Sequence, residues 1–222
     1  MQLSLLTSTP DIVATGYMVN LLLGPPELLG AEASALGYDG IEFFPGPPGT
    51  VGMAEMDQAL KRFDLTLTAV NSGRIVAEGL TLLHPDAAIR ARALNRVKDL
   101  LNFAGRFGAP VTLAGTKGSL PAGASVEAAE TLAEEIFSHL AHFGASVGST
   151  LLLAPTHEAD SNFICMIPAA SRPARGEGPV WIGAPSWPPC GTSATRAPRQ
   201  SAWPTAVTVG RRARRQFLTC GR

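Results

Sequence analysis

The sequence predicts an α/β fold in which helices cover a parallel β-sheet. Two observations support this prediction: short apolar segments of strand length recur along residues 1–165, and longer segments with helical spacing separate them. Strands that alternate with helices favour a parallel sheet with right-handed crossovers. The predicted strands are residues 3–6, 40–44, 65–70, 111–114 and 150–153.

Four segments have the apolar spacing of helices. The clearest is 85–106, where Pro85 suits the first turn and Asp86 complements the positive end of the helix dipole. The second is 125–143, with Ser125 as N-cap and Gly144 as its end. Segments 26–36 and 54–63 are weaker helices of the same type. The expected order is therefore strand–helix four times, followed by a fifth strand.

This pattern leaves two architectures open, a doubly wound sheet and part of an eight-stranded barrel. A nucleotide-binding sheet usually carries a glycine-rich phosphate motif after its first strand. No GxGxxG follows residues 3–6, and no P-loop motif occurs in the chain. The absence of both motifs weighs against a nucleotide-binding sheet.

Charge is distributed very unevenly along the chain. Residues 1–165 hold 17 acidic side chains against 9 Lys and Arg, whereas residues 166–222 hold nine Arg and a single acid, Glu177. The second segment also contains eight Pro and all three Trp. Because Pro forbids long helices, we expect 166–222 to be irregular, with short strands at most at 180–182 and 206–209. The predicted domain boundary lies at residue 165.

Cysteine usage and the N-terminus indicate an intracellular protein. The three Cys are widely spaced and form no CxxC pair, which argues against a zinc site and against a disulfide framework. A reducing cytoplasm is then the expected location. Residues 1–13 do not read as a signal peptide, and no apolar run is long enough to span a membrane.

Several strings in residues 1–164 resemble the xylose isomerase-like barrel family of sugar isomerases, sugar epimerases and relatives of endonuclease IV. GYDGIEFFP resembles its second strand, LTLTAVNSG its third, and LLHPDAAIRARAL the start of its third helix. NFAGRFGAPVTLAG resembles the fourth strand and LLLAPTHEADSNF the fifth. Because these strings occur in the family's order, the resemblance favours a partial (β/α) TIM-type barrel of about five strands.

The resemblance also implies a chemistry, and this chain departs from it. In such enzymes a divalent metal (Mn, Mg, Co or Zn) polarises a sugar carbonyl while carboxylates move a proton at the adjacent carbon. The family's fifth-strand Glu, a metal ligand and acid/base, is replaced here by Ala154. Its later ligands are an Asp, a His and a Glu, and residues 166–222 contain no Asp or His. We therefore expect no intact catalytic residues and no bound metal.

Five residues are candidates for substrate binding, each with a plainer alternative. Glu42 lies at the end of the second strand, where barrel active sites form, or is a buried structural acid. Asn71 follows the third strand and lines a sugar pocket, or forms a turn with Ser72 before Gly73. Lys117 follows the fourth strand and meets a phosphate, or lies in a solvated loop. His157 and Glu158, with Asp160, form a makeshift metal site or an exposed loop.

The leading hypothesis is a sugar isomerase/epimerase homologue that acts on a small sugar or hydroxy-carbonyl compound and is inactive or impaired. One alternative is an interaction protein whose RRARR segment at 211–215 binds nucleic acid, although the surrounding composition also fits an out-of-frame product of a GC-rich gene. Another is a DNA-repair relative of endonuclease IV. A barrel cut after five strands leaves an open sheet edge, so self-association is expected.

Overall fold

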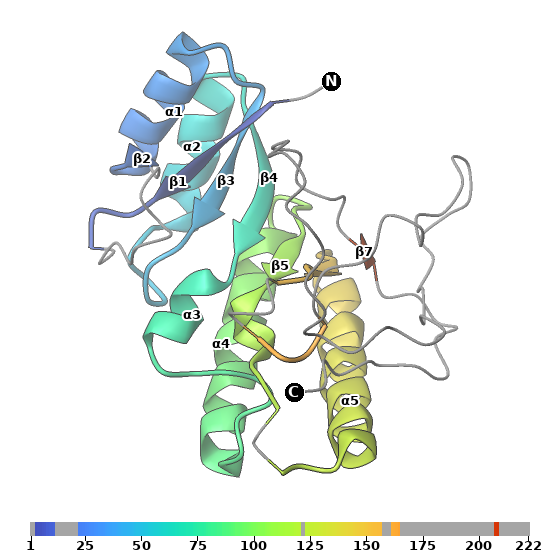
Figure 1. The fold of residues 1–222 in the computed structure, drawn as a ribbon. Helices are drawn as coiled ribbons and strands as arrows, with labels where there is room; N and C mark the ends of the chain where they lie inside the picture. Colours follow the sequence, from blue (N-terminus) through green and yellow to red (C-terminus); the bar gives the residue numbers. More distant parts are fainter. Residues whose placement is uncertain (1–2, 12–21, 121–122, 157–160, 165–206, 209–222) are drawn as a thin grey trace, which may run out of the picture.

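A computed structural model describes residues 3–11, 22–120, 123–156, 161–164 and 207–208 of the 222-residue chain. One sheet runs through these residues, and its helices pack in two pairs, α1 with α2 and α4 with α5 (Figure 1). The predicted α/β class with a parallel sheet is confirmed.

The sheet has the order β2-β1-β3-β4-β5-β6-β7. All pairs from β2 to β6 are parallel, and only β7 runs antiparallel to its neighbour β6. Consecutive long strands are neighbours, as in the wall of a barrel. The bounds of the strands are β1 Ser4–Ser8, β2 Leu22–Leu23, β3 Gly40–Phe44, β4 Thr66–Asn71, β5 Val111–Leu113, β6 Leu151–Leu153 and β7 Val207–Thr208.

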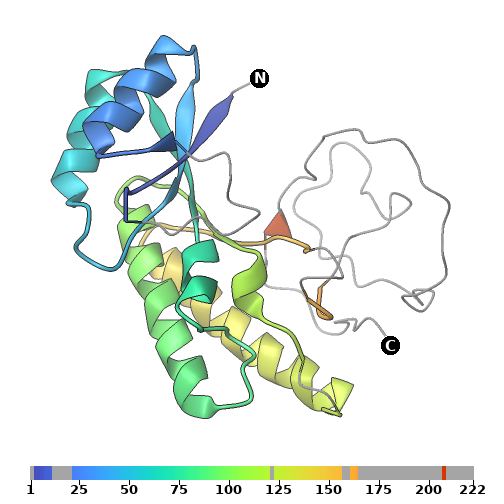
Figure 2. The ribbon, with the colours of Figure 1, turned by 60° about the vertical axis from the view of Figure 1, so that its left-hand side comes forward.

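Helices connect these strands and cover one face of the sheet. The two longest, α4 and α5, run side by side (Figure 2). Gly105 permits their close approach, because a Cβ at this position would lie 2.1 Å from the Val147 carbonyl oxygen. The helices are α1 Pro26–Ala35, α2 Met53–Arg62, α3 Gly73–Ala77, α4 Ala87–Gly105 and α5 Val126–Ser146, with a 3₁₀ turn η1 at Gly115–Lys117.

The strands have one buried and one partly exposed face. On β3, Ile41 and Phe43 are buried, and the Phe43 ring lies 6.1 Å from that of Phe103 on α4. Their neighbour Glu42 points to the opposite face and is half-buried. The register places further half-buried residues beside it. We call this the open face, and it comprises Leu6, Glu42, Ala69, Asn71, Thr112 and Leu152.

The buried face holds the core. Residues two apart on β3, β5 and β6 pack against the helices, as period-two alternation requires. On β4 the core residues Leu67 and Val70 are three apart, where the register with β3 shifts. The hydrophobic contribution of this burial is about 25 cal/mol per Å² of apolar surface. The strand residues of the core are Ile41, Phe43, Leu67, Val70, Val111, Leu113, Leu151 and Leu153.

The predicted elements are all present, with shifts at their ends. Helix α4 begins at Ala87, two residues later than Pro85. Asp86 is its N-cap, and the Asp86 carboxylate accepts a hydrogen bond from the backbone N–H of Ala88 at 2.8 Å. Ser125 caps α5 as expected, but that helix continues past Gly144 to Ser146. Three short elements were missed, namely β2, α3 and η1. Each has five residues or fewer, too few for a periodic pattern to show.

Part of the predicted irregular segment lies outside the described residues. The expected strand at 180–182 falls there, as do most of 166–222. The expected strand at 206–209 is present as β7. No helix in the described part of the chain is long and apolar enough to cross a membrane.

Candidate active site

Glu42 and Asn71 are brought together on the open face near the carboxyl ends of β3 and β4. Asn71 donates a hydrogen bond from Nδ2 to Oε1 of Glu42 at 2.8 Å. Its own Oδ1 accepts from the backbone N–H of Gly73 at 2.9 Å. The carboxamide is thus held at both ends, and within the described ranges the second Glu42 oxygen accepts no hydrogen bond. The two predicted roles of Asn71, pocket lining and turn formation, are compatible.

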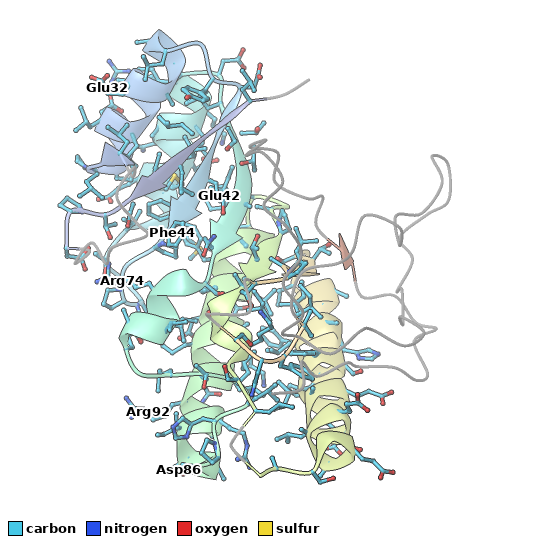
Figure 3. All side chains as sticks on the ribbon, viewed as in Figure 1. Glu32, Glu42, Phe44, Arg74, Asp86 and Arg92 are labelled. Atoms are coloured by element: carbon cyan, nitrogen blue, oxygen red, sulfur yellow. The ribbon has the colours of Figure 1, made fainter. Side chains whose placement is uncertain are left out.

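Figure 3 shows how Glu42 lies relative to Phe44 and Arg74. Glu42, Phe44 and Arg74 follow one another toward the end of β3. In a barrel enzyme the carboxyl ends of the strands form the active site. The Glu42–Asn71 pair therefore lies where chemistry would occur.

Ser72 belongs to a buried network between β4 and β5. Its hydroxyl donates to the Thr112 carbonyl oxygen at 2.8 Å and lies 2.8 Å from Thr116 Oγ1. The Thr116 hydroxyl in turn donates to the Ser72 carbonyl oxygen at 2.9 Å. Both side chains are fully buried. This network fixes the spacing of the two strand ends and does not face a ligand.

Lys117 is fully buried at the end of β5, within η1. Its Nζ donates to the Ala114 carbonyl oxygen at 3.0 Å and to Thr156 Oγ1 at 2.7 Å. A solvated loop, one of its two predicted settings, is therefore wrong. The ammonium ties the ends of β5 and β6 together, because a buried charge needs such partners.

Arg74 on α3 is a site residue that the sequence did not single out. Its NH2 donates to Asp11 Oδ2 at 2.6 Å, and NH1 lies 3.4 Å from Thr9 Oγ1. This hydrogen bond lowers the pKa of Asp11 below its ordinary value. The guanidinium thus joins the end of β4 to the end of β1. No motif signals it, because α3 is too short to be seen in the sequence.

The end of β6 carries no acidic group at its expected position. Ala154 is half-buried, and its backbone N–H donates to the Leu113 carbonyl oxygen at 2.8 Å. His157, Glu158 and Asp160 lie outside the described residues. The chain returns at Ser161, whose hydroxyl donates to the Gly118 carbonyl oxygen at 2.8 Å. Ala154 thus lies directly after the carboxyl end of β6, but its side chain supplies only a methyl group.

The described residues do not fit a divalent metal. Hard cations of this type need several oxygen or imidazole donors within reach of one point. In the described ranges no three His, Cys, Asp or Glu side chains lie close enough to share an ion. Glu42 is the open face's carboxylate, and its hydrogen-bonded neighbour is an amide.

Comparison with known protein families resolves the architecture. The family described as xylose isomerase-like TIM barrel matches residues 31–183. The chain belongs to this family. The barrel, rather than the doubly wound sheet, is therefore the architecture of which this sheet is a part. The match runs past residue 165, where the composition changes, to residue 183.

Solved structures of xylose isomerase-like proteins share the fold. The 3-keto-D-glucoside 4-epimerase of E. coli is 13% identical, with a TM-score of 0.52 over 69% of this chain and 57% of that one. An L-ribulose 3-epimerase is 16% identical, with a TM-score of 0.52 over 69% and 50%. A xylose isomerase domain protein from Planctomyces limnophilus is 15% identical, with a TM-score of 0.50 over 72% and 56%.

The covered length and the low identity both limit what these structures show about this chain. This chain spans about half the length of each of these xylose isomerase-like structures. At such low identity they show the fold alone. No curated protein matches the sequence.

Proposed function

We propose that this chain is a sugar isomerase/epimerase homologue that binds a small sugar or hydroxy-carbonyl compound at the carboxyl ends of its strands. Membership of the xylose isomerase-like family and the position of the Glu42–Asn71 pair support this proposal. A carboxylate beside a fixed carboxamide suits vicinal hydroxyl groups, because the carboxylate accepts and the amide can also donate. Such a pair would orient the substrate.

We further propose that turnover is absent or strongly impaired. Ala154 carries this proposal, because an alanine can neither hold a cation nor move a proton. In the parent chemistry a bound metal would polarise the carbonyl, but the described residues lack the donors to hold it. Positioned general acids and bases each contribute typically 10²–10⁴-fold to a rate. Loss of one carboxylate should therefore be visible in an assay.

The test is an assay of ketose C3 epimerisation and aldose–ketose isomerisation with added Mn²⁺. An L-ribulose 3-epimerase serves as the positive control. We expect activity at least about 10²-fold below that control, the range of a single lost acid or base. Turnover comparable with the control would contradict the proposed impairment.

Binding is tested separately from turnover. Isothermal titration with D-fructose and D-ribulose should detect a complex in the unaltered chain. Glu42→Gln keeps the shape of the side chain but removes its charge, so affinity should fall by about tenfold, the value of a hydrogen bond to a charged group. An unchanged affinity would place the ligand elsewhere. Glu134→Gln, an exposed change on α5, is the matched control.

The family match does not favour either alternative function over the sugar hypothesis. A nucleic-acid-binding arm would depend on residues 211–215, which lie outside the described residues. A DNA-repair role requires several metal ligands, which the described residues do not provide. We therefore keep the sugar hypothesis as the proposed function.

A further inference from the structure

Arg74 lies across the ends of three neighbouring strands. It follows β4 directly, and its guanidinium reaches Thr9 and Asp11, which follow β1. Strand β3 lies between these two strands in the sheet. β3, the strand that carries Glu42, ends at Phe44, and Figure 3 labels Arg74 beside Phe44.

The Arg74 charge is mostly withdrawn from water. Its side chain is 15% exposed, and the carboxylate that it binds, Asp11, is 43% exposed. In the described residues, none accepts a hydrogen bond from Arg74 Nε. Within the described part of the chain, one donor of the guanidinium fork is thus unused, and an arginine can bind an oxyanion with two parallel bonds.

From this arrangement we infer that Arg74 forms an oxyanion subsite beside the Glu42–Asn71 pair. Its ligand is the acidic group, carboxylate or phosphate, of a small polyhydroxy-carbonyl compound. The hydroxyl-bearing part of that compound would contact Glu42, a placement that rests on the proposed function. The more exposed Asp11 carboxylate holds the guanidinium in the free protein and yields to the ligand.

The other buried cation of the rim cannot take this role in the same way. Lys117 is fully buried and binds Ala114 and Thr156 between β5 and β6. Among the residues that the structure describes, Arg74 combines an open donor with a partner, Asp11, that is 43% exposed. An acidic substrate exchanges one carboxylate for another there, so the buried charge stays compensated throughout.

The experiment compares neutral and acidic ligands of matched shape by isothermal titration at fixed ionic strength. The pairs are D-ribulose with D-ribulose 5-phosphate, and D-fructose with D-fructuronate. In the unaltered chain the acidic member of at least one pair should bind more tightly. Arg74→Met should lower the affinity for that acidic member by about tenfold or more and leave the neutral member unchanged. Preference for only one pair identifies the anion as phosphate or carboxylate.

Asp11→Asn is a second variant for this test, in which Arg74 itself is unaltered. Removing the competing carboxylate should raise the affinity for the acidic ligand by about two- to fivefold, the range of an exposed ion pair. An unchanged or lower affinity in Asp11→Asn overturns the inference, even where Arg74→Met fails to fold. Equal binding of neutral and acidic members also overturns it. If the neutral sugars still bind in a Glu42-dependent manner, the proposed function survives that result.

Discussion

Asn71 Nδ2 and Glu42 Oε1 lie 2.8 Å apart, and this contact joins two neighbouring strands on the open face of the sheet. The same carboxamide accepts from the Gly73 N–H, where α3 begins. One side chain therefore sets the orientation of a carboxylate and the start of the helix that carries Arg74.

Asn71→Asp should destabilise the fold in a pH-dependent way. The new carboxylate would keep the Gly73 contact but face Glu42, and two like charges at this distance raise the pKa of the pair above the unfolded values. Stability is then highest below the unfolded pKa and is lost as pH rises through the folded one. We expect a loss of about 1–3 kcal/mol at pH 7 that shrinks below pH 4, measured by urea unfolding.

A second substitution tests the cause of that loss. Glu42→Gln in the Asn71→Asp background restores one donor and one acceptor in reversed order. Most of the lost stability at pH 7 should return. A double variant no more stable than Asn71→Asp alone would mean that the contact does not act through charge.

Lys117→Ala should be among the most destabilising single changes at the rim. The side chain is fully buried, so its removal leaves a cavity and two acceptors, Ala114 O and Thr156 Oγ1, without their donor. We expect a loss of about 2–5 kcal/mol in chemical denaturation. Lys117→Met fills most of the cavity, so it separates packing from hydrogen bonding and should cost less. A loss below about 0.5 kcal/mol in both variants would fit a solvated side chain instead.

Gly105→Ala should destabilise the packing of α4 on α5. Alanine for glycine usually stabilises a helix by about 0.5–1 kcal/mol. Here, however, the new Cβ would lie 2.1 Å from Val147 O, a backbone atom that cannot move alone. We expect a net loss of about 1–3 kcal/mol, seen as a lower Tm. Gly115→Ala is the matched control, because its nearest neighbour is Val76 Cγ2 at 3.5 Å.

The Asp11–Arg74 pair should contribute stability that acid removes. Because the hydrogen bond from Arg74 lowers the pKa of Asp11 in the folded state, the contribution is present above the unfolded pKa. It is lost as pH falls through the lower folded value. Asp11→Asn should therefore be less stable than the unaltered chain at pH 7 by about 0.2–1 kcal/mol, and equal to it in strong acid. A constant difference across the titration would contradict this linkage.

Glu130→Gln should raise the stability of the fold at pH 7, whereas Asp11→Asn should lower it. Burial, with a smaller effect of Glu127, raises the pKa of Glu130 on α5. The folded state therefore binds a proton more readily than the unfolded state and loses stability as pH rises through the folded pKa. Removing the charge should raise the Tm at pH 7 and leave it unchanged below pH 4. Glu134→Gln, exposed on the same helix, is the control.

The strand–helix order and the face on which Glu42 lies were predictable from the sequence, because local patterns produce both. Ile41 and Phe43 alternate with Glu42, and this alternation alone assigns Glu42 to the face opposite the core. The apolar spacing of 85–106 likewise predicts a helix, with an error of two residues where Asp86 takes the cap. The missing carboxylate at Ala154 is also a fact of sequence, and it determines the expected loss of chemistry.

Only the tertiary structure decided what each polar side chain does. Lys117 lies in a GTKGS string typical of an exposed loop, yet it is fully buried and donates to Thr156, which follows β6. Arg74 carries no motif, and its partner Asp11 is 63 residues away in the chain. Such contacts depend on which strands become neighbours, and a sequence pattern with a range of a few residues cannot contain that information. The physical reason is that periodicity reports burial along one element, whereas hydrogen bonds at a strand end join different elements.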